Sequence, residues 1–221
     1  IVNEVLERFH QVLKNHPVNE ERIKRGLPPA NIILCRGAGV LPKINPFPLK
    51  FGIKAAAVAA MPLVRGVCKV AGMRILDAPG ATGGYDTDVI SKAKTALEAL
   101  QNEDFVLIHV KATDLASHDA KVERKIEMIE KVDKMVGYLI DNVNREETYI
   151  AVTADHTTSS VLKEHTGDPV PVALWGPYVR TDDIREYSER SCAYGGLGRI
   201  RGKDLMYTIA NMLGKMRKFG A

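Results

Sequence analysis

Five side chains that carry metal-binding atoms follow apolar stretches of the sequence. Asp114 and His118 come after one stretch, Asp155 and His156 come after a second, and His165 follows in a loop. In open α/β sheets, ligands bind beyond the carboxyl ends of the strands. Oxygen and imidazole ligands without thiolates suit Mn, Mg, Zn or Co, and a pair of such ions stabilises both oxygens of a phosphoryl displacement. The five residues therefore predict a two-metal site for phosphate chemistry.

Each position also has a simpler interpretation. A helical turn would place Asp114 and His118 on one face, but Asp114 could equally cap the following helix while His118 lies at the surface. Asp155 could form an Asx-turn with an incidental His156 beside it. His165 lies among turn-forming residues and, taken alone, is typical of a solvent-exposed histidine. The five together favour the metal site.

Three basic residues are candidates for binding a phosphate group. Lys111 stands just before Asp114, Arg36 precedes a glycine, and Arg65 is the third candidate. A solvated lysine at 111 and a plain turn at 36 are the alternatives. The glycine-rich stretch 80–84 lacks the Gly-Lys-Ser/Thr ending of a P-loop, so it is interpreted as a turn near the substrate or a simple connection.

Apolar runs alternate with helical periodicity along the chain, as in α/β proteins. The predicted strands are 31–35, 53–60, 105–108, 149–152 and 170–175. The predicted helices are 2–13, 63–71, a helix with apolar face 89–100 capped by Asp86 or Thr87, 122–143 and 204–216. This alternation predicts a mostly parallel sheet with helices on both faces.

Composition excludes several classes of protein. The 221 residues are 45% hydrophobic and 26% charged, with a net charge of +4, which is too modest for a general nucleic-acid binder. The 3 cysteines are far apart and form no C-x-x-C pair, which favours a reducing cytoplasm over a disulfide scaffold. We find no membrane span and no signal peptide. The chain starts at Ile1 inside a predicted helix, which suggests a missing upstream segment.

Several motifs together carry a family resemblance. They are His16-Pro17-Val18-Asn19, Pro29-Ala30-Asn31, Arg36-Gly37-Ala38-Gly39, Gly80-Ala81-Thr82-Gly83 with Tyr85-Asp86-Thr87, the run from His109 to Asp119, Thr153-Ala154-Asp155-His156, and His165. Over nearly its whole length the chain resembles the archaeal-type branch of the cofactor-independent phosphoglycerate mutases, within the alkaline phosphatase superfamily.

The resemblance implies a fold and a division of the ligands. The fold is a three-layer αβα alkaline-phosphatase-like core with a mostly parallel sheet and its N-terminal portion missing. Residues 1–30 correspond to the end of an inserted substrate-clamping domain and its hinge, and residues 31–221 to the C-terminal part of the metal-binding core. In this family one ion takes the counterparts of Asp114, His118 and His165, and the second takes those of Asp155 and His156.

The same resemblance implies an activity that this chain does not complete alone. Family members interconvert 3-phosphoglycerate and 2-phosphoglycerate in glycolysis and gluconeogenesis, through a phosphoserine intermediate and two divalent metals, with Mn expected and Mg, Co or Zn as alternatives. The aspartate and the nucleophilic serine that complete the second metal site lie upstream of the matched region. Thr113, Ser117 and Ser159 are the hydroxyls weighed as candidates close to the ligands, and none occupies the family's nucleophile position.

We therefore expect a cytoplasmic isomerase as the full-length protein and an inactive chain by itself. Its partner would be the phosphoglycerate substrate, with no nucleic acid and no membrane, and the oligomeric state is left open. Another phosphomonoesterase or phosphopentomutase of the superfamily is one alternative, and a catalytically inactive metal-binding fragment is the other.

Overall fold

A computed structural model describes residues 1–35, 37 and 39–216 of the chain. These residues divide into two compact units, with the boundary between Lys43 and Ile44. The domain boundary after residue 30 that the resemblance implies stays a prediction. Within the described residues, no helix combines the length and the apolar character needed to cross a membrane.

The first unit contains two helices, α1 (Val2–Lys14) and α2 (Pro17–Lys24). The predicted helix over 2–13 is confirmed, and α2 begins at Pro17 because His16 caps it by accepting a hydrogen bond from the backbone N–H of Val18. The buried amide of Asn19 ties the unit together. It donates to the carbonyls of Leu13 and Ala30 at 2.7 and 3.1 Å, and accepts from the N–H of Ala30 at 2.8 Å.

The strand expected over residues 31–35 is wrong, since these residues belong to neither a helix nor a strand. A strand requires a neighbour for its backbone groups. Here the carbonyl of Asn31 pairs instead with the Nδ1 atom of His10, at 2.8 Å. Ile32 and Leu34 are 68% and 81% exposed, so their apolar character does not reflect burial in this unit.

The second unit is built on a parallel sheet in the order β2-β1-β3. Its strands are β1 (Ala55–Val58), β2 (Arg74–Leu76) and β3 (Phe105–Ile108), and β1 lies in the middle with all four residues buried. The small side chains of β1 allow helices to approach closely on both faces. Two antiparallel pairs complete the strands: β4 (Ile150–Thr153) with β7 (Val172–Trp175), and β5 (Thr157–Ser159) with β6 (Glu164–Thr166).

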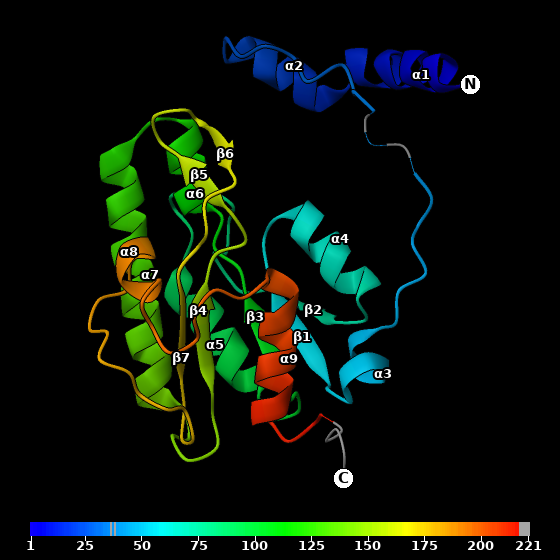
Figure 1. Cartoon of the computed structure of the whole chain (residues 1–221). Coiled ribbons are helices and arrows are strands. Elements are labelled where there is room, and N and C mark those ends of the chain that lie inside the picture. Colours follow the sequence, from blue (N-terminus) through cyan, green and yellow to red (C-terminus); the bar gives the residue numbers. More distant parts are fainter. Residues whose placement is uncertain (36, 38, 217–221) are drawn as a thin grey trace. The chain divides into compact units, whose positions relative to one another are not determined.

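Helices cover both faces of the parallel sheet (Figure 1). On one face Ala55 and Ala57 pack with residues of α4 (Pro62–Val70) and α9 (Gly202–Met212). On the other face Ile108 packs against α5 (Val89–Ala99) and α7 (Val122–Asn142). This arrangement confirms the predicted αβα class and the mostly parallel sheet. The remaining helices are α3 (Phe47–Phe51), α6 (Ala112–His118) and α8 (Glu189–Cys192).

Most predicted elements of this unit are confirmed to within a few residues, but the cap of α5 is not the predicted one. Asp88 is the N-cap, and its side chain accepts a hydrogen bond from the backbone N–H of Ser91 at 2.8 Å. Asp86 and Thr87 were the sequence candidates. Both instead form hydrogen bonds with Thr82 inside the preceding turn. The carboxylate of Asp86 accepts from the hydroxyl of Thr82, and the hydroxyl oxygen of Thr87 accepts from the backbone N–H of Thr82.

Candidate metal centre

Helix α6 carries two of the candidate ligands on one face. Asp114 and His118 are one turn apart, and Nε2 of His118 lies 3.4 Å from Oδ1 of Asp114. Ala112 and Ala116, on the other side of the helix, are fully buried. Packing of this small-residue face therefore directs the carboxylate and the imidazole away from the core.

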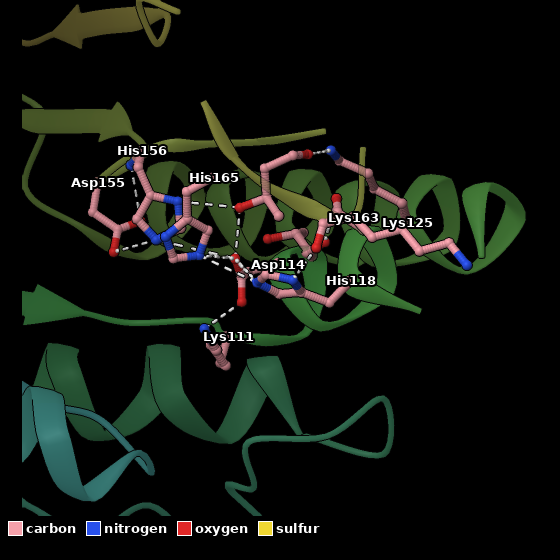
Figure 2. A network of polar contacts seen from close by, with 11 residues as sticks. Lys111, Asp114, His118, Lys125, Asp155, His156, Lys163 and His165 are labelled. Atoms are coloured by element: carbon pink, nitrogen blue, oxygen red, sulfur yellow. Dashed lines mark hydrogen bonds and ion pairs between the residues drawn. The ribbon is translucent and has the colours of Figure 1, made fainter. Parts of the chain in front are cut away.

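The β5–β6 hairpin brings a third ligand to the same carboxylate. Thr158 of β5 pairs with His165 of β6 in the antiparallel register, so their side chains lie on one face. Nε2 of His165 is 3.3 Å from Oδ1 of Asp114 and 3.2 Å from Nε2 of His118. Figure 2 shows the imidazoles gathered around Asp114. His165, expected from the sequence in a loop, therefore lies on a strand and belongs to the cluster around Asp114.

Asp155 and His156 follow β4 after one intervening residue and lie beside this cluster. Nε2 of His156 is 3.4 Å from Oδ2 of Asp155 and 4.0 Å from Oδ1 of Asp114. The ring of His156 packs against that of His165, with centroids 3.7 Å apart. The Asp155 side chain is 72% exposed, whereas that of Asp114 is 12% exposed. Asp155 therefore forms the open side of the site.

The ring orientation of His118 is set by a backbone group. Its Nδ1 atom lies 2.7 Å from the carbonyl oxygen of Lys163, which can only accept a hydrogen bond. Nδ1 must therefore carry the proton, and in the neutral ring the lone pair is on Nε2, the atom that faces Asp114. This is the tautomer that binds a metal through Nε2.

Asp114 is the electrostatic centre of the cluster. Burial raises the pKa of its carboxyl, but hydrogen bonds from Lys111 and Thr158 outweigh burial and hold the pKa at about 2. The Lys111 ammonium forms an ion pair with Oδ2. The carboxylate is therefore ionised at neutral pH.

The donor set fits a divalent ion. One ligand atom from each of Asp114, His118 and His165 can be chosen so that all lie within 4.8 Å of one another, a spacing that a single ion could bridge. A carboxylate and two imidazoles, with no thiolate, suit Zn, Mn or Co better than a purely oxygen-seeking ion. The Nε2 lone pair of His118 and Oδ1 of Asp114 are both acceptors and lie 3.4 Å apart, an arrangement that a cation between them would make favourable.

The three residues predicted to bind phosphate differ in their position relative to the cluster. Lys111 lies within the cluster, paired with Asp114. Arg65 does not contact the five candidate ligands in the described structure. Its guanidinium donates to the carbonyl of Ala59, just beyond β1, at 3.0 Å and to the carboxylate of Asp77 at 2.6 Å. Arg36 lies outside the described residues.

Tyr85, the residue after the glycine-rich stretch 80–84, lies against the end of α6. The hydroxyl of Tyr85 donates to Asp119, the residue after the His118 ligand candidate, at 2.8 Å. Lys131 of α7 donates to the Tyr85 carbonyl at 3.0 Å, and Lys121 pairs with the same Asp119 carboxylate. Hydrogen bonds of its hydroxyl and its carbonyl therefore hold Tyr85 next to the end of the helix that carries two candidate ligands.

Sequence reasoning missed the hydroxyl that contacts the ligands. Thr158 is buried, and its Oγ1 lies 2.6 Å from Oδ1 of Asp114 and 3.1 Å from Nδ1 of His156. Of the three hydroxyls noted from the sequence, Ser117 is buried and donates to the carbonyl of Thr113 in its own helix. One feature of the sequence could have indicated Thr158. It lies two residues after His156, and residues two apart in a strand point to the same face, whereas Thr157 points to the opposite face.

Comparisons with known proteins identify the family to which the chain belongs and support the architecture. A family model described as the metalloenzyme superfamily matches residues 11–212. The chain is 45% identical over its full length to a Methanocaldococcus jannaschii protein named 2,3-bisphosphoglycerate-independent phosphoglycerate mutase 1, and covers 54% of that protein. It is 50% identical over its full length to an Ignicoccus hospitalis protein of the corresponding name, and covers 53% of it.

Two solved structures are similar to this chain in both sequence and fold. A Pyrococcus horikoshii protein superposes with a TM-score of 0.89 at 46% identity, covering 100% of this chain and 59% of that one. A cofactor-independent phosphoglycerate mutase from Thermoplasma acidophilum gives 0.63 at 30% identity, covering 96% and 51%. The chain spans about half the length of the curated relatives it matches. The resemblance found in the sequence is confirmed, and the chain belongs to the metalloenzyme superfamily.

Proposed function

We propose that this chain is the metal-binding part of an enzyme that interconverts 3-phosphoglycerate and 2-phosphoglycerate. The observation that carries the proposal is the convergence of His118 and His165 on one oxygen of Asp114. The names of the relatives supply the substrate class.

Two divalent ions would occupy the site, and manganese is the expected metal. Asp114, His118 and His165 would hold one ion, and Asp155 and His156 would contribute to the second. The ions would supply positive charge to the nucleophile and to the phosphoryl oxygens. The remaining ligand and the nucleophilic serine would come from a part of the longer protein that this chain does not include.

The residues of this chain would bind and orient rather than form the covalent bond. Lys111 lies beside Asp114, so its ammonium would exchange part of its ion pair for the phosphoryl group of the substrate. The further cationic candidates are Arg36 and Arg65. The guanidinium of Arg65 contacts Ala59, just beyond the end of β1. In the proposed sequence of steps, the serine accepts the phosphoryl group from the 3-position, the bound glycerate re-orients, and the group passes to the 2-hydroxyl.

The assignment of domains and of cellular site belongs to the same proposal. Residues 1–30 would form the end of the substrate-clamping insertion and its hinge, and residues 31–221 the metal-binding core. The reaction would take place in the cytoplasm, as a step of glycolysis and gluconeogenesis.

The test compares the full-length protein with site variants. Asp155→Asn and His118→Ala should each lower mutase turnover with added Mn²⁺ by about 100-fold or more, because each removes a ligand of a different ion. Asp141→Asn is the matched control, since that carboxylate is exposed and pairs only with Arg145 among the described residues. Wild-type turnover in either ligand variant would overturn the assigned site.

A second readout separates the mutase from its alternatives. Phosphate release from simple esters without interconversion of the phosphoglycerates would identify a phosphomonoesterase, and interconversion of pentose phosphates a phosphopentomutase. The chain of 221 residues, assayed alone, should be inactive because it lacks the nucleophile.

A further inference from the structure

Thr158 contacts side chains from both halves of the candidate centre. Its Oγ1 atom is 2.6 Å from Oδ1 of Asp114, which belongs to the three-residue cluster, and 3.1 Å from Nδ1 of His156, which belongs to the Asp155 pair. In the register of the hairpin it also lies opposite His165. No other described hydroxyl makes hydrogen bonds with two of the five candidate ligands.

The position of Thr158 is fixed from several sides. The residue is 5% exposed, and its backbone carbonyl accepts a hydrogen bond from Lys125 of α7 at 3.1 Å. Its neighbour Thr157 points to the other face of the strand and donates to the carbonyl of Asp168 at 3.2 Å. The hydroxyl of Thr158 is therefore held between the two ligands rather than free to rotate toward solvent.

Hydrogen-bond chemistry allows only one arrangement of protons in this group. A metal-binding carboxylate is ionised and can only accept, so the single hydroxyl proton of Thr158 points to Asp114. The oxygen of Thr158 then faces Nδ1 of His156 as an acceptor, and Nδ1 must donate. The lone pair of a neutral His156 is consequently on Nε2, which lies 3.4 Å from Oδ2 of Asp155.

We propose that Thr158 is a positioning residue that joins the two metal positions, by fixing one oxygen of Asp114 and the metal-binding tautomer of His156 in a single chain of hydrogen bonds. The chain runs from His156 Nδ1–H to Thr158 Oγ1, and from Thr158 Oγ1–H to Asp114 Oδ1. His118 obtains the corresponding tautomer from a backbone carbonyl, so each of these two histidines has its own orienting acceptor.

This inference rests on the proposed function for the identity of the ions, but its first readout does not need them. In the metal-free chain labelled with ¹⁵N-histidine, long-range ¹H–¹⁵N correlations at pH about 8 distinguish Nδ1–H from Nε2–H rings. His156→Gln assigns the signal. Wild-type His156 should be the Nδ1–H form, and Thr158→Ser should retain it. Thr158→Val, which has the same shape without the hydroxyl, should shift the ring toward the Nε2–H form.

Metal affinity is the second readout, measured by titration calorimetry of the same chain with MnCl₂. Thr158→Val should weaken binding by about 10- to 100-fold, the usual effect of losing a partner that orients a ligand. Thr158→Ser should restore affinity to within about threefold of wild type. Thr157→Val, a matched substitution on the opposite face of the strand, should leave both readouts unchanged.

Three results would overturn the proposal: an Nε2–H ring for His156 in the wild-type chain, an unchanged tautomer in Thr158→Val, or wild-type Mn²⁺ affinity in Thr158→Val. If the valine variant does not fold, the wild-type tautomer decides alone. A full-length protein without mutase activity would defeat the proposed function while leaving the tautomer result intact, so the two failures are distinguishable.

Discussion

The Nδ1 atom of His118 lies 2.7 Å from the carbonyl oxygen of Lys163, although the two residues are 45 positions apart in the sequence. Lys163 has a φ angle of 59°, which is unusual for a residue with a side chain. Its backbone N–H donates to the carbonyl of Ser159 at 2.7 Å, within the turn that joins β5 to β6. The left-handed backbone conformation of the exposed Lys163 therefore directs its carbonyl oxygen toward Nδ1 of His118 and so orients this candidate ligand.

Substitutions at Lys163 should separate backbone conformation from side-chain chemistry. Lys163→Gly should leave Mn²⁺ affinity within about threefold of wild type, because glycine adopts a positive φ readily. Lys163→Val should weaken affinity by about tenfold, since a β-branched residue resists this conformation and would displace the carbonyl. Titration calorimetry of the 221-residue chain makes the comparison. Equal affinity in the valine and glycine variants would show that the carbonyl does not orient His118.

Metal addition should stabilise the chain against heat. An ion that binds only the folded state, present at about 100 times its Kd, contributes about 2.7 kcal/mol. For a chain of this size that corresponds to an increase in Tm of about 5–10 °C with MnCl₂, reversed by EDTA. His165→Ala should abolish most of the increase, because His165 supplies one of the three converging ligand atoms.

A matched control exists for the thermal experiment. His10→Ala removes a histidine of the first unit, which pairs with the Asn31 carbonyl and lies outside the metal cluster. Its Tm without metal can differ from wild type, but the increase caused by MnCl₂ should be the same. A metal-induced increase that survives His165→Ala would place the ion elsewhere.

Acid should destabilise the metal-free chain through Asp114. The pKa of this carboxyl falls from 3.8 to about 2 on folding, against the effect of burial, because Lys111 and Thr158 hydrogen-bond to the ionised form. A lowered folded-state pKa contributes stability above the unfolded pKa, and that stability is lost as the pH falls from about 4 toward 2. The shift corresponds to about 2 kcal/mol.

The measurement for Asp114 is urea unfolding of wild type and Asp114→Asn in EDTA between pH 2 and 6. The difference in unfolding free energy between the two proteins should shrink as the pH falls through the range from about 4 to 2. A difference that stays constant over this range would show that the carboxyl is not held in its ionised form by its neighbours.

The sequence predicts the regular elements better than the contacts that complete the site. β1, β3 and α7 are recognisable because apolar residues recur with the period of a buried strand or an amphipathic helix. The same rule fails at residues 31–35, which are apolar but lack a neighbouring strand in the described structure. Periodicity reports which residues avoid water, and it does not report which partner covers them.

The candidate ligands themselves were predictable, since their types and positions after strands are visible in the sequence. The residues that orient them were not. Thr158 and Lys163 act through a short polar hairpin whose register pairs Thr158 with His165, and no hydrophobic alternation marks that register. Lys163 contributes only a carbonyl, which every residue possesses. Such positions become visible only when the backbone path is known.

Lys92 offers a test of charge in the core of the second unit. This lysine of α5 is 1% exposed, and its ammonium donates to the carbonyl of His109, just past β3, at 2.9 Å. Burial lowers the pKa of its amine because the charged form loses water. Since the folded state disfavours the charged form, the charge reduces stability below the folded-state pKa. Wild-type stability should therefore rise as the pH increases through the folded-state pKa toward the unfolded value.

Replacing this buried ammonium with an apolar chain of similar length should stabilise the fold at neutral pH. Lys92→Met should raise the unfolding free energy by about 1 kcal/mol or more at pH 7, because well-packed apolar replacements of buried charges are often stabilising. The gain should diminish toward pH 10. Lys94→Met, on the exposed side of the same helix, should change stability by less than about 0.5 kcal/mol. Loss of stability in Lys92→Met at pH 7 would mean that the hydrogen bond to His109 outweighs the cost of burying the charge, so that the lysine holds the end of β3 in place.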